Sequence, residues 1–419
     1  MRILLAGLVG LLSACASEPA SDTIVVPSVI DEALAAMVDD GRVIGVTALV
    51  YEDGVEAYSA SFGLSDREAE RAMARDSMFQ IFSMTKAVTG AAFLTLHDEG
   101  AFSLDDPITD YIPEFADVMV FEGLNEDGEA ILVPPRQMPT VRDAMMHMVG
   151  LYGGADGTYL GQLYAERDPL NVMAYTTEEA ITNLASIPLA YHPGEAWRYS
   201  NSMDLQVLMI ERITGMAYKD YLQETILDPL EMVDTSYHVE EQDRDRLSGL
   251  YQLGQDGVQT RVPNDFTGPV VFGEPRFNPG SWGLVSTADD YMRFALMLQN
   301  DGILEGERIL SEEAVRLMRT NHLPDNVTER HWLPGKASYK TMGFGLNVAV
   351  RVGAPATLEE TYGVPGEFYW DGYPSTLFWI DPENDITAVF LVQQLPYNDE
   401  LHRAFRNAVY NQDRPWARP

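Results

Sequence analysis

Apolar residues follow two different periods along the chain, and the two periods occupy different regions. Alternating or continuous runs of branched and aromatic residues indicate strands close to both ends. The predicted strands are 43–51, 56–62, 343–350, 367–370, 376–380 and 386–392. Apolar residues spaced by three or four positions dominate the middle and indicate helices. The predicted helices there are 177–186, 202–214, 218–226 and 289–299, with further helices at 27–40 and 401–410.

This distribution predicts a mixed α/β (α+β) fold. Strands from the two chain ends are expected to form one antiparallel sheet with helices packed against it. The mostly helical region, roughly 102–300, is expected to be a lobe inserted into that α/β part. Residues 23–419 are thereby predicted to form one coupled domain.

Residues 79–90 carry the first candidate chemistry. Ser83 stands three positions before Lys86, and apolar residues at helical spacing follow. Both side chains are therefore expected on one face of the first helical turn. A serine hydroxyl needs a neighbouring base to act as a nucleophile, and a desolvated lysine amine can be that base. The alternative is that Ser83 only caps the helix and Lys86 is solvated.

The composition excludes several classes of function. A formal net charge of −36 argues against nucleic-acid binding and against electrostatic docking to anionic lipids. Neither an H-E-x-x-H motif nor a Cys/His cluster occurs, so the sequence predicts no metal site and no cofactor. Of the seven histidines, His147 is the one that could reach the candidate site, although a structural role is the main interpretation for all of them.

The first 22 residues have the pattern of a targeting segment. Arg2 precedes an apolar run over 3–12, which is too short to span a bilayer and is typical of a signal peptide. Cys15, the single cysteine, ends a Leu-Ser-Ala-Cys stretch that resembles the lipobox of bacterial lipoproteins. That resemblance implies lipidation of Cys15 and a short tether up to residue 22. The expected location is the periplasmic side of a bacterial membrane, with the outer membrane favoured; an ordinary secretory signal is the alternative.

Two later stretches complete a recognisable pattern. Trp197-Arg198-Tyr199-Ser200-Asn201 precedes a predicted helix, and 367–376 surrounds a late strand. With the Ser83–Lys86 pair, in this order, the chain resembles the serine β-lactamase-like superfamily, which includes class C β-lactamases, DD-peptidases and family VIII esterases. The resemblance implies that Ser83 is acylated, that Lys86 is its base partner, and that Tyr199 shuttles a proton. Asn201 would hydrogen-bond Lys86 and the substrate. Outside this pattern, Tyr199 would be read as a buried aromatic residue.

The third stretch departs from the penicillin-recognising pattern. Trp370 stands where many such members have a lysine, as in many family VIII esterases. The indole is expected to offer an apolar wall to an uncharged group of the substrate. Gly372 and Tyr373 are also expected to contact the substrate, with the backbone N–H groups of Ser83 and Tyr373 forming an oxyanion hole.

The resemblance implies a serine hydrolase that works through a covalent acyl-enzyme, with short-chain esters as the expected substrates. A β-lactamase or DD-carboxypeptidase acting on cell-wall peptides is the first alternative. A catalytically silent binding protein on the same fold is the second alternative. Such a protein would be expected to lack one of the three parts of the pattern, which are the Ser83–Lys86 pair and the stretches 197–201 and 367–376. Acyl transfer to an alcohol instead of water is also compatible with the sequence.

Overall fold

The computed structural model describes residues 23–412, except 155, 264–266, 328–329, 332–340 and 358–359. The predicted targeting segment and Cys15 lie outside the described residues. Within the described part of the chain, no helix is long and apolar enough to cross a bilayer.

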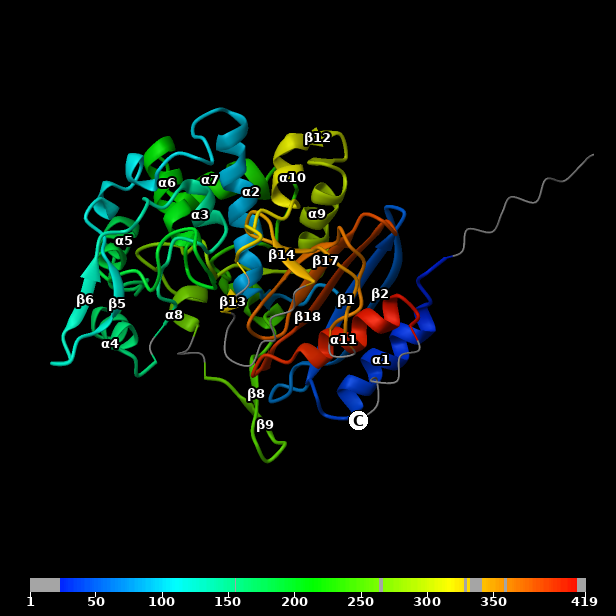
Figure 1. The fold of residues 1–419 in the computed structure, drawn as a ribbon. Coiled ribbons are helices and arrows are strands. Elements are labelled where there is room, and N and C mark those ends of the chain that lie inside the picture. Colours follow the sequence, from blue (N-terminus) through cyan, green and yellow to red (C-terminus); the bar gives the residue numbers. More distant parts are fainter. Residues whose placement is uncertain are drawn as a thin grey trace, which may run out of the picture.

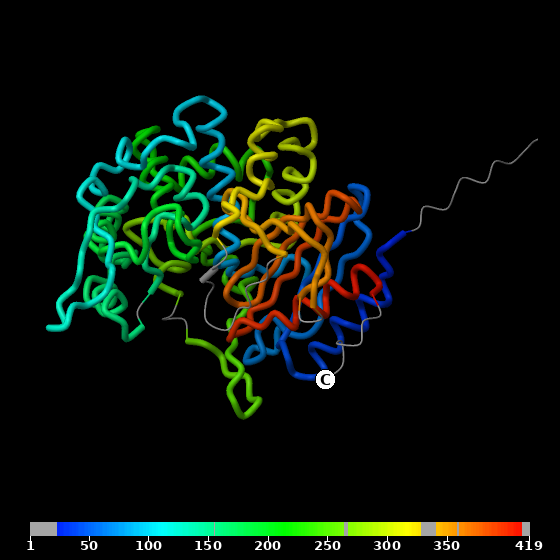
Figure 2. The backbone as a smooth tube through the Cα atoms, in the orientation of Figure 1, coloured from blue at the N-terminus to red at the C-terminus, as the bar shows by residue number. Residues whose placement is uncertain are grey.

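An antiparallel sheet built from both chain ends forms the centre of the fold (Figure 1). Its order is β14-β15-β16-β17-β18-β1-β2-β3, so the C-terminal strand β18 lies beside the N-terminal strand β1. The late strands are β14 (Met342–Phe344), β15 (Ala349–Arg351), β16 (Phe368–Asp371), β17 (Leu377–Asp381) and β18 (Ile386–Val392). The early strands are β1 (Gly45–Glu52), β2 (Val55–Asp66) and β3 (Arg71–Ala72). In Figure 2 the orange and blue parts of the tube lie side by side in this sheet, and they meet where β18 pairs with β1. The predicted fold class is confirmed.

The two faces of the sheet bury alternate residues of the same strands. Along β18, Ala388 and Phe390 pack toward α1 (Pro27–Asp39) and α11 (Asp399–Val409), which lie side by side in Figure 1. Val389 and Leu391 belong instead to the large core on the opposite face. Because side chains alternate along a strand, a sheet covered on both faces needs apolar residues at every position. This explains why β18 is a continuous apolar run.

The second face is covered by α2 (Thr85–Asp98), α9 (Ala288–Gln299) and α10 (Glu312–Met318). Helix α2 is buried on almost all sides, since it also packs against α6 (Met203–Thr214) of the helical region. That region also contains α3 (Val141–Met145), α4 (Tyr159–Arg167), α5 (Thr177–Ala185), α7 (Tyr218–Leu222) and the short α8 (Gly268–Val271). Helix α2 therefore joins the sheet to the helices and presents its N-terminus between them.

One predicted strand is wrong. Residues 343–350 form a hairpin of β14 and β15 rather than a single strand, and Asn347 turns the chain with φ = 63°. The side-chain amide of Asn347 donates to the Lys86 carbonyl at 2.9 Å and to Gln206 Oε1 at 2.9 Å. Asparagine tolerates the left-handed conformation better than most residues, and here it also satisfies buried polar groups. The division into a domain from residue 23 and an inserted lobe at 102–300 stays a prediction.

Candidate active site

A short, tightly held loop carries Ser83. Strand β4 (Phe79–Gln80) pairs with β10 (Val285–Ser286), and the Ile81 N–H donates to the Leu284 carbonyl at 3.0 Å. Phe82 adopts φ = 45°, an unfavourable conformation for a bulky residue, and begins a 3₁₀ turn that runs into α2. Such strain persists only where the surroundings fix the backbone. Ser83 is therefore held at a defined position at the start of α2, with its side chain partly exposed.

Lys86 lies one turn into α2, on the face that carries Ser83. Its Nζ is 3.4 Å from Ser83 Oγ and donates to the Ser281 carbonyl at 2.7 Å. The side chain is only 2% exposed, so its polar end is shielded from bulk water. The alternative interpretation of a solvated lysine does not fit this burial.

Tyr199 approaches Ser83 from the helical side. It follows β7 (Trp197–Arg198), and its hydroxyl donates to Ser83 Oγ at 2.7 Å. Lys86 Nζ lies 4.7 Å from the centre of the Tyr199 ring. Burial raises the pKa of Tyr199 well above its ordinary value, against the opposing effect of the Ser83 hydrogen bond. At neutral pH the residue is therefore a phenol, which has a proton to donate. The structure thus brings the polar ends of all three predicted catalytic side chains together.

An aromatic layer lies behind Tyr199. The centres of the Trp370 and Tyr199 rings are 5.7 Å apart. The His147 ring packs against Tyr199, and the Phe344 ring packs against Trp370. Trp370 is 1% exposed, which corrects the expectation that it offers a wall to the substrate. The prediction from sequence did not include the rings of Tyr199, His147 and Phe344, which cover the Trp370 side chain of β16. Trp370 instead supports the Tyr199 ring, and its side chain acts to lower the Tyr199 pKa.

His147 belongs to this buried layer. Burial, and secondarily the charge of Lys86, hold the pKa of His147 well below its ordinary value. Its Nδ1 lies 3.2 Å from Ser202 Oγ and accepts from the Ser200 N–H at 3.3 Å. Through these hydrogen bonds, a neutral His147 holds the backbone around Ser200 in place, and Tyr199 is part of that segment.

Asp204 and Ser281 are part of the site, and sequence reasoning missed them. Asp204 is 1% exposed, and its Oδ1 accepts the Ser281 N–H at 3.0 Å, while the Ser281 carbonyl accepts from Lys86. Burial raises the pKa of Asp204, and Lys86 opposes that shift. A buried carboxylate needs a compensating cation. The sequence does carry a signal for Asp204, because this aspartate stands five positions after Tyr199 among the apolar residues of α6.

The end of β16 lies directly against the Ser83 loop at Gly372. A Cβ built on Gly372 would stand 2.5 Å from the Ile81 carbonyl oxygen, so only glycine allows this approach. Tyr373, 41% exposed, follows, and its ring centre lies 6.2 Å from that of Phe82. The backbone of Tyr373 is thereby placed next to the Ser83 loop, as an oxyanion hole would require.

Asn201, the remaining predicted binding residue, lies at the start of α6. Its side chain is partly exposed, and its backbone carbonyl accepts the Asp204 N–H at 3.0 Å. Its predicted hydrogen bonds to Lys86 and to a substrate stay predictions. Among the described residues, no group of three or more His, Cys, Asp or Glu side chains is arranged to hold a metal ion.

A family model described as "Beta-lactamase" matches residues 30–411 of the chain. The chain belongs to the β-lactamase family. It is 34% identical over 361 residues to "Protein Rv1367c" of Mycobacterium tuberculosis, which covers 85% of this chain and 88% of that protein. It is also 30% identical over 283 residues to "Esterase EstB" of Burkholderia gladioli, which covers 64% of this chain and 67% of EstB.

A solved structure shares the fold of this β-lactamase family member. "EstCE1, a hydrolase with promiscuous acyltransferase activity" superimposes with a TM-score of 0.73 at 22% identity, covering 91% of this chain and 98% of EstCE1. With esterases among its relatives, the protein is a serine hydrolase of the β-lactamase family.

Proposed function

We propose that the protein is a carboxylesterase that cleaves short-chain esters through an acyl-enzyme on Ser83. The observation that carries this proposal is the arrangement around Ser83 Oγ. The hydroxyl of Tyr199 lies 2.7 Å away and the amine of Lys86 3.4 Å away. These contacts supply what a serine nucleophile requires: a proton acceptor and a route for returning the proton to a leaving group.

In the acylation step, Ser83 Oγ attacks the ester carbonyl, and the new Oγ–C bond forms as the Ser83 proton passes to Lys86 Nζ, 3.4 Å away, which must enter the step as the unprotonated amine. The carbonyl oxygen becomes an oxyanion, which the backbone N–H groups of Ser83 and Tyr373 stabilise. The C–O bond to the alcohol then breaks, and the Tyr199 hydroxyl gives the departing oxygen a proton. The alcohol leaves, and the acyl group stays on Ser83.

Deacylation repeats these steps with water as the nucleophile. Water loses its proton to the Lys86–Tyr199 pair as it attacks, and Ser83 Oγ recovers a proton when the acid leaves. An alcohol in place of water would give a new ester, so acyl transfer is a second candidate. It is supported by the fold shared with EstCE1, which is described as a hydrolase with acyltransferase activity.

The preference for esters over cell-wall substrates rests on charge and on leaving groups. Penicillin-recognising relatives use a lysine where this chain has Trp370, so the cation that meets a substrate carboxylate there is replaced. The net charge of −36 adds repulsion toward small anions. Alkoxides and phenolates also leave more readily than amines, so an ester is cleaved without that cation.

A substrate panel on one preparation tests this proposal. We expect p-nitrophenyl acetate and butyrate to be cleaved well, nitrocefin weakly and D-Ala-D-Ala peptides hardly at all, with Ser83→Ala as the blank. If kcat/KM for nitrocefin or for the peptide exceeds that for every short ester, the β-lactamase or DD-carboxypeptidase alternative replaces the esterase. If every substrate binds but none is cleaved, the catalytically silent binding protein replaces the esterase.

We further propose that the mature protein is held on a membrane through lipidated Cys15, facing the periplasm. The Leu-Ser-Ala-Cys stretch supports this location. The membrane-bound fraction of the wild type and of Cys15→Ala should be compared by fractionation. An unchanged fraction in Cys15→Ala would remove the lipid anchor from the account.

A further inference from the structure

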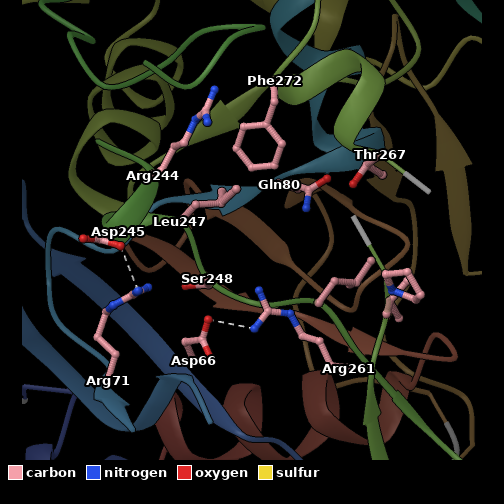
Figure 3. A pocket seen from close by; sticks show the side chains of 13 residues that line it. Asp66, Arg71, Gln80, Arg244, Asp245, Leu247, Ser248, Arg261, Thr267 and Phe272 are labelled. Atoms are coloured by element: carbon pink, nitrogen blue, oxygen red, sulfur yellow. Dashed lines mark hydrogen bonds and ion pairs between the residues drawn. The ribbon is translucent and has the colours of Figure 1, made fainter. Parts of the chain in front are cut away.

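A pocket of about 330 Å³ lies beside the Ser83 loop (Figure 3). Gln80, three residues before Ser83, forms part of its wall. Three residues of extended chain span at most about 11 Å, so this wall is within that distance of the Ser83 backbone. Leu250 and Val262 also line the pocket, and both pack in one apolar cluster with Phe82. The pocket is therefore a neighbour of the nucleophile.

The walls of the pocket combine an apolar surface with an excess of positive charge. Leu250, Val262 and Phe272 supply the apolar part. Three arginines but only two carboxylates line the rest, although the whole chain has 64 acidic and 28 basic residues. Within this lining, basic side chains outnumber acidic ones, which is the reverse of the balance of the whole chain.

Two of the three arginines are neutralised within the pocket. Arg261 donates to Asp66 at 2.7 Å, and Arg71 donates to Asp245 at 3.1 Å. Figure 3 shows both pairs as dashed lines on the wall opposite Phe272.

Arg244 is different. Its guanidinium carbon lies 5.1 Å from the centre of the Phe272 ring, and within the described part of the chain no carboxylate pairs with it. A guanidinium on an aromatic face keeps its in-plane N–H donors available, in the geometry that suits a carboxylate.

We propose that this pocket receives a carboxylate at the far end of the acyl chain, so that among esters of equal chain length those whose acyl chain ends in an acid group are favoured. The inference rests on the proposed function, and it names the class of ester. The ester carbonyl lies at Ser83, the chain contacts Leu250 and Val262, and the terminal carboxylate meets Arg244. The acyl chain must pass Leu250 and Val262 before its end meets Arg244, so several methylene groups are required between the ester and the carboxylate.

Two series of substrates test this inference. One comprises mono-p-nitrophenyl esters of succinate, adipate, suberate and sebacate; the other comprises p-nitrophenyl esters of monocarboxylic acids with equal chain lengths. The measured quantity is the ratio of kcat/KM for the charged ester to that for its neutral partner. Each ratio is determined for the wild type, for Arg244→Gln and for the control Arg316→Gln, which alters an exposed arginine paired with Glu313 on α10.

We expect Arg244→Gln to lower the ratio about fivefold at one or more of the longer chain lengths, the size of a solvent-accessible ion pair. Arg316→Gln should leave the ratio unchanged. Turnover of the neutral esters should be the same in all three proteins, because Arg244 is exposed and outside the catalytic group.

The outcomes separate this inference from the function on which it rests. If neutral esters are cleaved but Arg244→Gln changes the ratio at no chain length, or no more than Arg316→Gln does, the pocket is not a carboxylate subsite. If the wild type cleaves no ester of either series, the esterase proposal fails and this inference fails with it.

Discussion

Replacing Gly372 with alanine should disable the enzyme through a single methyl group. The added Cβ would stand 2.5 Å from the Ile81 carbonyl oxygen, whereas comfortable non-bonded contacts need about 3.5 Å. Either the end of β16 or the Ser83 loop must therefore move by about 1 Å. The Cβ would also overlap with the Thr376 hydroxyl oxygen. Moving the end of β16 away from Ile81 would therefore not be enough to remove both overlaps.

A displacement of this size has a large effect on catalysis and a moderate effect on stability. Misplacing reacting groups by 1 Å can cost about 100-fold in rate. We therefore expect kcat for p-nitrophenyl butyrate to fall about 100-fold in Gly372→Ala. The overlap should lower the free energy of unfolding by about 1–3 kcal/mol, which leaves the protein folded at 25 °C.

Steady-state kinetics and thermal unfolding on the same preparations provide the assay. Gly157→Ala is the matched control, because a Cβ there meets no atom within 4 Å and the residue does not have positive φ. The control should behave as the wild type. If Gly372→Ala retains kcat within twofold of the wild type, the end of β16 does not position the catalytic groups as described.

Two carboxylates give predictions that depend on pH. Burial raises the pKa of Asp204 above its ordinary value, and the charge of Lys86 favours the ionised form; on acidification, activity should therefore fall at a higher pH than an ordinary carboxylate would give. Asp204→Asn should lower kcat about tenfold and abolish that acidic limb of the kcat profile, whereas an unchanged limb would assign it to another group. Burial also raises the pKa of Asp290 from 3.8 to about 6, so its stabilising contribution is complete below pH 4 and is lost as the pH rises through 6. Relative to Asp290→Asn, the wild type should lose up to about 3 kcal/mol of unfolding free energy over that interval in urea titrations, and parallel curves would contradict this.

Much of the sheet could be predicted because it is coded locally. Strand β18 spans Ile386–Val392, the predicted range, and β1 differs by one or two residues at its ends. A strand that is buried on both faces leaves a continuous apolar run, which is visible without any partner. The hairpin at β14 and β15 was missed because Asn347 turns the chain in order to bond groups on α2 and α6.

The site was only partly predictable for the same reason. Ser83 and Lys86 share a helical turn, so their proximity follows from spacing. The positions of Asp204 and Ser281 depend on contacts between segments about 77 residues apart, which no local pattern encodes. The sequence predicts Trp370 at the substrate because of its place in the stretch 367–376. Its burial depends on the rings of Tyr199, His147 and Phe344, which reach it only in the folded chain.

Labelling with a fluorophosphonate probe, followed by mass spectrometry of the digested protein, tests the central claim most directly. The probe phosphonylates serines that are activated for nucleophilic attack. The arrangement of Tyr199 and Lys86 around Ser83 predicts one modified peptide, the one that contains Ser83, and no labelling or ester turnover in Ser83→Ala. A label on another serine, or turnover by Ser83→Ala at the wild-type rate, would contradict the assignment of Ser83 as the nucleophile.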